Sequence, residues 1–157
     1  MNENIFLPPE TNARPRILVV DDDRSIRLLN FEVLTSHGYE VAVATDGAAA
    51  WDELQSNHYD LLVTDNDMPR LSGLELIRQL HDTHMTLPVI MLTGTSPLEV
   101  LARQPELQIE AVLLKPYTIN ELLDAVKNVL RMGSSGPAAI ALPHWQRPSA
   151  TDGRRLE

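Results

Sequence analysis

The sequence predicts an α/β domain in which helices cover both faces of a parallel β-sheet. Short apolar segments alternate five times with amphipathic ones, the connections are short, and each apolar segment is apolar throughout. Alternating strands and helices favour a parallel sheet with right-handed crossovers. Continuously apolar strands are typical of a sheet that is buried on both faces. The 157 residues suit one domain at 16–132, with an N-terminal extension at 1–15 and a linker or tail at 133–157.

Five segments are predicted strands, because each is short, apolar and mostly β-branched or aliphatic. They cover residues 16–20, 40–44, 60–64, 88–92 and 111–114. Each is followed by polar or turn-forming residues, so each strand has a defined carboxyl end.

Five segments between or after these strands are predicted helices, because their apolar residues recur with helical spacing. They are residues 24–37, 48–57, the segments that begin at Ser72 and Ser96, and 118–131. Gly38 is typical of the position just past a helix end, and Pro105 limits the fourth helix. The last three helices begin with Ser or Thr followed three residues later by Glu, the pattern of a capping box at Ser72, Ser96 and Thr118.

Composition excludes several classes of function. The formal net charge is −9 and no basic stretch is segregated, so direct nucleic-acid binding by this domain is not expected. The chain has no cysteine, which excludes disulfides and thiol catalysis. We see no membrane span and no signal peptide, so a cytoplasmic location is expected.

The composition changes at Gly133, where glycine, serine and proline interrupt any regular period. Ile140, Leu142 and Trp145 could dock on the domain, but we favour an extended tail with incidental apolar residues.

Chemically active side chains follow the predicted strands. Asp21 and Asp22 follow the first strand, Asp65 the third, Thr93 the fourth and Lys115 the fifth. The carboxyl ends of parallel strands meet at one edge of a sheet, where ligands bind in open α/β folds. Clustered carboxylates repel, and Mg²⁺, which prefers oxygen ligands and keeps waters for a phosphate, would relieve that repulsion. An ammonium and a hydroxyl beside it suit the oxygens of a transferring phosphoryl group.

Four motifs in this order resemble the receiver domain of two-component response regulators. They are ILVVDDD, DLLVTDNDMP followed by SGLEL, PVIMLTG and LLKPY, within residues 16–131. Each motif alone is weak, whereas the set in order is specific. The resemblance implies a flavodoxin-like, doubly wound sheet of order 2-1-3-4-5 with its site at the topological switch point.

The resemblance also implies a role for each site residue. Asp65 would accept a phosphoryl group from a histidine kinase or a histidine phosphotransfer protein. Asp65 and Asp22 would ligate Mg²⁺ directly, together with the backbone carbonyl of Asp67, while Asp21 would act largely through a metal-bound water. Such a domain signals by conformational change and is not an enzyme with turnover on other substrates.

Lys115 and Thr93 would bind the acyl phosphate, and the Lys115–Pro116 peptide bond is expected to be cis. The downstream partner cannot be read from the sequence, and a homodimer is possible.

Three features depart from the family pattern. Val112 stands where an aromatic switch residue is usual, three positions before the lysine. Residues 108–110 are Gln-Ile-Glu in place of the usual Gly-Ala-Asp. Asp67, two residues past Asp65, adds a fourth acid at the mouth of the site. We expect Asp67 either to slow attack on anionic donors or to tighten the cation site.

Several of these residues, and two histidines, also allow other interpretations. Asp21–Asp23 could simply cap the first helix. His81 and His84 could bind a metal, but exposed positions at a helix end are favoured, and Trp51 is interpreted as a packing residue. Asp65-Asn66-Asp67 also fits the motif of an aspartyl-phosphate phosphatase of the haloacid-dehalogenase type, although on the wrong strand and without a cap domain.

The remaining alternatives are a pseudo-receiver that is not phosphorylated and the receiver part of a longer DNA-binding or enzymatic regulator. A stand-alone receiver is slightly favoured over the latter. No effector pattern follows Arg131.

Overall fold

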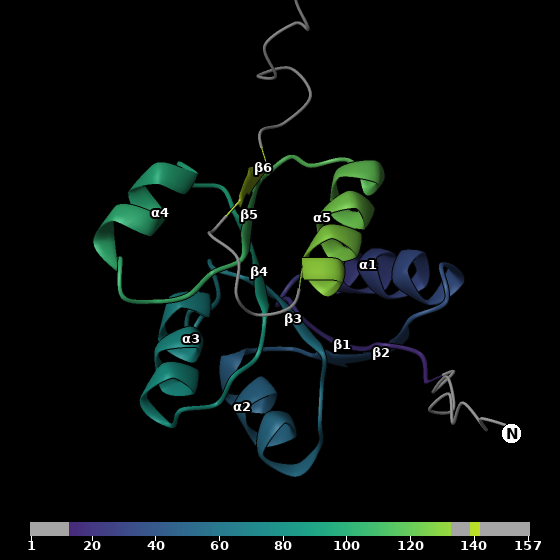
Figure 1. Ribbon diagram of the computed structural model, residues 1–157, viewed down its shortest axis with the longest axis horizontal. Helices are drawn as coiled ribbons and strands as arrows, with labels where there is room; N and C mark the ends of the chain where they lie inside the picture. Colours follow the sequence, from purple (N-terminus) through teal and green to yellow (C-terminus); the bar gives the residue numbers. More distant parts are fainter. Residues whose placement is uncertain (1–12, 133–138, 142–157) are drawn as a thin grey trace, which may run out of the picture.

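The protein forms one parallel sheet with strand order β2-β1-β3-β4-β5-β6 (Figure 1). The computed structural model describes residues 13–132 and 139–141. The strands are β1 (Arg16–Val20), β2 (Glu40–Ala44), β3 (Leu61–Asp65), β4 (Val89–Thr93), β5 (Ala111–Leu114) and β6 (Ala139–Ala141). The helices are α1 (Arg24–Ser36), α2 (Gly47–Ser56), α3 (Gly73–Asp82), α4 (Pro97–Arg103) and α5 (Ile119–Met132). The predicted order 2-1-3-4-5 is confirmed, with one strand added beside β5.

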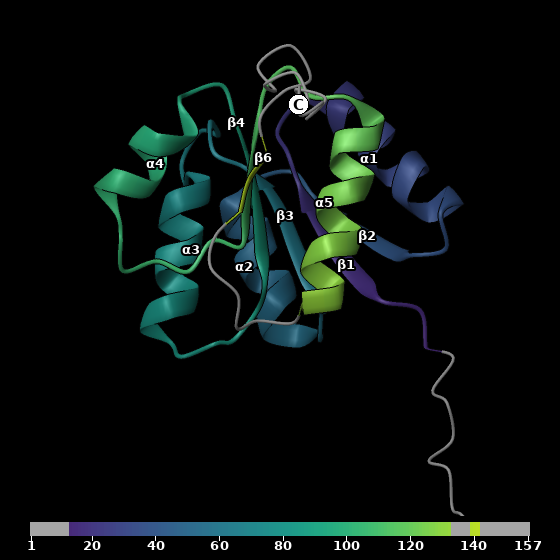
Figure 2. The same cartoon turned by 45° about the horizontal axis from the view of Figure 1, so that its top comes forward.

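Helices cover both faces of the sheet, as predicted. Figure 2 shows α1 and α5 on one side and α2, α3 and α4 on the other. Successive residues of β1 alternate between the two apolar layers: Ile17 and Val19 belong to the layer under α1 and α5, Leu18 and Val20 to the opposite one. This double burial explains why the central strands carry apolar residues on both faces.

The register staggers the carboxyl ends of the central strands. Asp65, the last residue of β3, pairs with Leu92 of β4, and Thr93 pairs with Leu114 of β5. Lys115 therefore begins the connection to α5 directly beside the end of β4. No helix in the part of the chain that the structure describes is long and apolar enough to cross a membrane.

Two of the three predicted capping boxes are present, at the starts of α3 and α5. They join Ser72 to Glu75 and Thr118 to Glu121. The box predicted at Ser96 is wrong, because Ser96 makes no side-chain hydrogen bond to the first turn of α4. The backbone of Ser96 has φ −50° and ψ 127°, close to the −76° and 115° of the capping residue Asp23, so the backbone angles alone do not account for the missing bond.

The preference for a wholly extended C-terminal tail needs correction. Ala139–Ala141 form β6, in which Ile140 pairs with Val112 of β5. Without β6 the outer edge of β5 would present unpaired peptide groups, and a parallel strand satisfies them. The strand follows α5 and so repeats the strand–helix–strand pattern of the domain. Leu142 and Trp145 lie outside the described residues.

Candidate functional site

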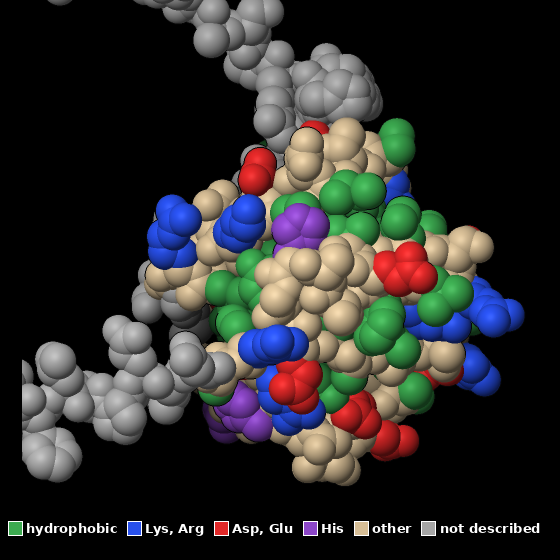
Figure 3. Space-filling view, turned by 90° about the vertical axis from the view of Figure 1, so that its right-hand side faces the viewer, with side chains coloured by type: hydrophobic (Ala, Val, Ile, Leu, Met, Phe, Trp, Pro, Cys, Tyr) green, Lys and Arg blue, Asp and Glu red, His purple; other side chains and the backbone are tan. Residues whose placement is uncertain are grey.

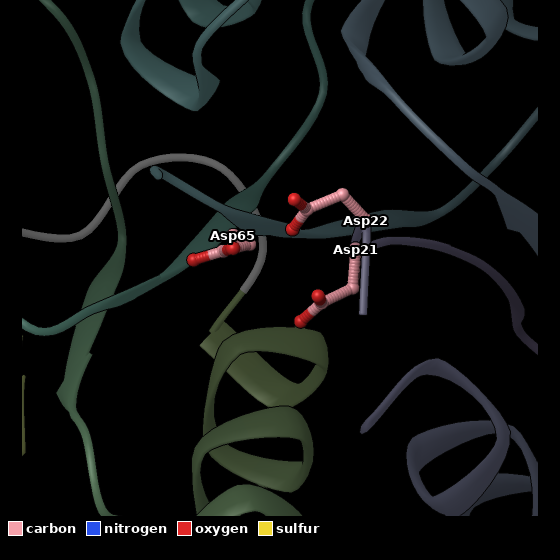
Figure 4. Close-up of side chains that lie close together, drawn as sticks. All are labelled: Asp21, Asp22 and Asp65. Atoms are coloured by element: carbon pink, nitrogen blue, oxygen red, sulfur yellow. The ribbon is translucent and has the colours of Figure 1, made fainter. Parts of the chain in front are cut away.

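Three carboxylates meet at the carboxyl edge of the sheet. Asp21 and Asp22 directly follow β1, and Asp65 ends β3 (Figure 4). One carboxylate oxygen from each residue lies within 4.8 Å of the others. Asp21 and Asp65 are buried, whereas Asp22 is exposed. The structure thus brings together the acids that the sequence places at two different strand ends.

Lys115 completes the cluster from the end of β5. Its Nζ lies 2.9 Å from Oδ1 of Asp65, and its backbone N–H donates to the carbonyl of Thr93 at 2.8 Å. Burial disfavours the charge of Lys115, but the hydrogen bond and proximity to Asp65 outweigh it, so the pKa of Lys115 is raised. Lys115 is therefore a cation fixed beside the most buried part of the acid cluster.

One buried oxygen of Asp21 lacks a hydrogen-bond partner among the described residues. Its Oδ1 accepts the Asp23 backbone N–H at 2.9 Å, while its buried Oδ2 has no hydrogen-bond partner among the described residues. Burial raises the pKa of Asp21 to about 6, and the nearby Asp65 carboxylate adds to the rise while the Asp23 hydrogen bond opposes it. A hard cation with oxygen ligands would supply the missing partner and remove the repulsion, so these three acids fit Mg²⁺.

The three consecutive aspartates divide their roles. Oδ1 of Asp23 accepts the backbone N–H groups of Ser25 and Ile26 and caps α1. The helix-cap interpretation is therefore right for Asp23, while Asp21 and Asp22 join Asp65 in the cluster.

Thr93 ends β4, and Asp67 lies on the loop that follows β3. The buried Thr93 holds its Oγ1 against the Thr95 backbone N–H at 3.0 Å. The Asp67 backbone N–H donates to Oδ1 of Asp65 at 3.3 Å. A Cβ built on Gly94 would lie 3.9 Å from Oδ2 of Asp67, which places that carboxylate beside the loop that follows β4. Among the described residues, no hydrogen bond or ion pair joins the side chains of Thr93 and Asp67 to the three clustered acids.

Two residues that sequence reasoning did not assign hold the end of β3 against α3. Gly73 approaches so closely that a Cβ there would lie 2.5 Å from the carbonyl oxygen of Asp65. Asn66 accepts the Leu74 backbone N–H on Oδ1 at 3.2 Å and the Gly73 N–H on its carbonyl at 3.2 Å. The glycine after a capping serine was a usable signal, because a residue without Cβ allows close backbone approach.

Helix α1 contributes two further residues that were not predicted. Arg27 donates from Nη1 to the Asp21 carbonyl at 2.8 Å. Asn30 bonds with its side-chain amide to the hydroxyl of Tyr117, two residues after Lys115. Asn30 occupies a position in the apolar stripe of α1, and a polar residue there was the signal that could have found it.

The remaining predicted residues can also be placed. The Lys115–Pro116 bond is cis, as expected. Val112 is fully buried in β5, and Trp51 packs against the core. The side chains of His81 and His84 are exposed, and no three-residue metal cluster within the described residues includes them.

A family model described as the response regulator receiver domain matches residues 17–127. The chain belongs to the response regulator receiver family. Curated relatives include Response regulator MprA of Mycobacterium sp. strain KMS, 40% identical over 129 residues, which are 81% of this chain and 56% of that protein. MprA of Mycobacterium tuberculosis strain H37Rv is likewise 40% identical over 127 residues, covering 81% and 55%. This chain thus spans little more than half the length of these relatives.

Solved structures agree with this membership. The receiver domain of Francisella response regulator 1452 has a TM-score of 0.71 and 30% identity, covering 76% of this chain and 98% of that one. A CheY-like receiver domain from Methanospirillum hungatei has a TM-score of 0.71 and 28% identity over 76% and 96%. Response regulator TrrA of Thermotoga maritima, solved in complex with Mg²⁺ and BeF, has a TM-score of 0.65 and 33% identity over 73% and 97%.

Proposed function

We propose that the protein receives a phosphoryl group on Asp65 from a histidine kinase or a histidine phosphotransfer protein. The observation that carries this proposal is the buried Asp65 carboxylate, held 2.9 Å from Lys115 and beside two further acids. Oδ1 of Asp65 accepts hydrogen bonds from Lys115 and from the Asp67 backbone, so Oδ2 is the freer oxygen for attack.

In the proposed transfer, a carboxylate oxygen of Asp65 forms a bond to phosphorus while the phosphorus–nitrogen bond of the donor phosphohistidine breaks. The donor imidazole takes up a proton as it leaves. The ammonium group of Lys115 would shift to contact one phosphoryl oxygen, and the hydroxyl of Thr93 would donate a hydrogen bond to another. Positioning and charge neutralisation are most of what phosphoryl transfer requires.

Asp21, Asp22, Asp65 and the carbonyl of Asp67 are the proposed Mg²⁺ ligands, with Asp21 acting through a metal-bound water. The unpartnered Oδ2 of Asp21 and the all-oxygen donor set support this assignment. Bound Mg²⁺ would neutralise charge that builds up on the phosphoryl oxygens.

The surface beside the site suits a protein donor. On the side that carries α1 and α5, apolar side chains reach the surface between charged ones (Figure 3). Leu28 and Leu29 of α1 and Ile119 of α5 are each nearly half exposed, at 47%, 48% and 46%. We propose that the protein phosphodonor contacts this side. The output partner, a homodimer and a cytoplasmic location stay predictions.

Intact-mass measurement after treatment with acetyl phosphate tests the proposal. We expect a gain of one phosphoryl group that requires Mg²⁺ and is absent in Asp65→Asn. Unchanged mass of the wild type, under conditions that label a control receiver, would contradict it. Sustained turnover of p-nitrophenyl phosphate would instead favour the aspartyl-phosphate phosphatase.

A further inference from the structure

A polar pair, made of the buried Asn30 and the partly buried Tyr117, lies beside the acidic cluster and takes no part in the proposed transfer. Asn30 of α1 is 1% exposed, and its Nδ2 donates to the hydroxyl oxygen of Tyr117 at 3.0 Å. The same hydroxyl lies 3.3 Å from Oδ1 of Asn30, to which it can donate. A buried amide is costly unless it is hydrogen-bonded, so this pair specifies one arrangement of the two elements that carry it.

Tyr117 belongs to the short connection that carries Lys115. The connection is fixed at its start by the Lys115 N–H bond to the Thr93 carbonyl and at its end by the capping box of Thr118 and Glu121. Between these anchors, the Tyr117 ring packs against the apolar layer under α1 and α5. The hydroxyl bond to Asn30 therefore determines how far this connection stands from α1.

Helix α1 also holds the acidic side of the site. Arg27 lies three residues before Asn30, on the same side of the helix, and donates to the Asp21 carbonyl at 2.8 Å. The helix thus contacts both the segment that carries the acids and the segment that carries the lysine. Its placement can set the distance between them.

We propose that Asn30 and Tyr117 are positioning residues that hold Lys115 in line with Asp65. The inference rests on the proposed phosphoryl transfer at Asp65. The Lys115 ammonium sits on a flexible four-carbon stem, so its position depends on the backbone at its base. Misplacement of a catalytic group by 1 Å can cost about 100-fold in rate.

Three variants separate positioning from stability. Tyr117→Phe removes the hydroxyl and leaves the Asn30 amide buried without that partner. Asn30→Leu removes the other half of the pair. The double variant carries both changes and places two apolar groups in contact. We expect each single variant to melt at a lower temperature than the wild type, and the double variant to recover most of that loss, since removing both partners of a buried bond costs less than removing one.

Two measurements report on Lys115 itself. The first is the rate of Asp65 phosphorylation by acetyl phosphate at saturating Mg²⁺. The second is acylation of lysine by an amine reagent, followed by mass spectrometry. Lys115 and Lys127 are the only lysines in the sequence, and the exposed Lys127 on α5 is an internal reference. We expect all three variants to be phosphorylated about 5- to 20-fold more slowly, as a displacement below 1 Å would give. Lys115 should be acylated faster relative to Lys127.

The double variant decides between the two roles. If it regains the wild-type rate and labelling ratio together with its stability, the pair is only structural and the proposal is overturned. Wild-type rates and ratios in the single variants would overturn it equally. If the wild type itself accepts no phosphoryl group, the proposed function fails, and the labelling ratio alone decides whether the pair positions Lys115.

Discussion

The carboxylate of Asp21 should make the stability of this domain depend on pH and on Mg²⁺. Asp21 is fully buried, and burial raises its pKa from 3.8 to about 6. A pKa rise of about two units corresponds to a free energy of about 3 kcal/mol between the protonated and ionised forms. Solvent at the open side of the cluster screens part of this, so we expect about 1–2 kcal/mol in practice.

The direction of the effect follows from proton linkage. The folded state binds a proton at Asp21 more tightly than the unfolded state does, so the contribution of this group is favourable at low pH. That contribution is lost as the pH rises from about 4 through about 6. Asp21→Asn cannot ionise. Without divalent cations the variant should therefore be more stable than the wild type by about 1–2 kcal/mol at pH 8, or roughly 4–8 °C in Tm. At pH 4.5 the difference should fall to about a third of this value.

Mg²⁺ should close most of this difference in stability at pH 8. A ligand present at ten times its Kd stabilises the folded state by about 1.4 kcal/mol, and Asp21→Asn should lose most of this gain. Asp23→Asn is the matched control, because Asp23 caps α1 and lies outside the cluster, and asparagine caps as well as aspartate does. Thermal melts at both pH values, with and without Mg²⁺, give the answer. The reasoning fails if Asp21→Asn is less stable than the wild type at pH 8 without Mg²⁺, or if it keeps the full response to Mg²⁺.

Three further predictions concern the surroundings of the site. Gly73→Ala should lower the free energy of unfolding by about 1–3 kcal/mol in urea titrations, because its Cβ would lie 2.5 Å from the Asp65 carbonyl oxygen; an unchanged midpoint would contradict this. Asp67→Asn should either speed labelling by acetyl phosphate or weaken Mg²⁺ binding, measured by rate and by titration, and no change in either would remove a role for that acid. The third prediction concerns β6. Replacing both Ala139 and Ile140 with proline removes the backbone N–H that donates to β5, whichever of the two residues carries it. Hydrogen exchange in β5 should then accelerate, while exchange in the rest of the sheet is unchanged.

Most of the fold could be predicted, because its signals are local. Each central strand carries apolar residues on both faces, and the helices between them carry apolar stripes and starting signals such as Ser72 and Thr118. Such patterns report burial directly. The cap at Ser96 could not be read in the same way, because a capping bond depends on where the side chain points in the folded chain and not on the identity of the residue alone.

The candidate site was predictable for a similar reason. Asp21, Asp65 and Lys115 each follow an apolar strand, and the parallel topology alone brings strand ends together. The supporting contacts were not predictable in detail. The Asn30–Tyr117 bond joins residues 87 positions apart, and its formation depends on how α1 is placed beside the connection between β5 and α5. A polar residue in an apolar stripe indicates that it has a hydrogen-bond partner, but the sequence does not identify that partner.

The C-terminal strand β6 could not be predicted from hydrophobic periodicity, because three residues are too few to show a period. Ala139–Ala141 gain their structure from the free edge of β5 and not from their own sequence. Propensity at such short segments is weak, and the available hydrogen-bond partners decide the outcome.

The placement of β6 bears on how the site could communicate with the surface. The family pattern has an aromatic ring three positions before the lysine, but Val112 stands at that position in this chain and is fully buried. A β-branched side chain has little rotameric freedom, so it cannot alternate between a buried and an exposed position as a ring can. A change at Thr93 or Lys115 would then have to travel through the backbones of β4 and β5, which those residues end or follow. The element paired with β5 on its outer side is β6, so the edge of the sheet, and not a rotating side chain, is the route that this structure offers.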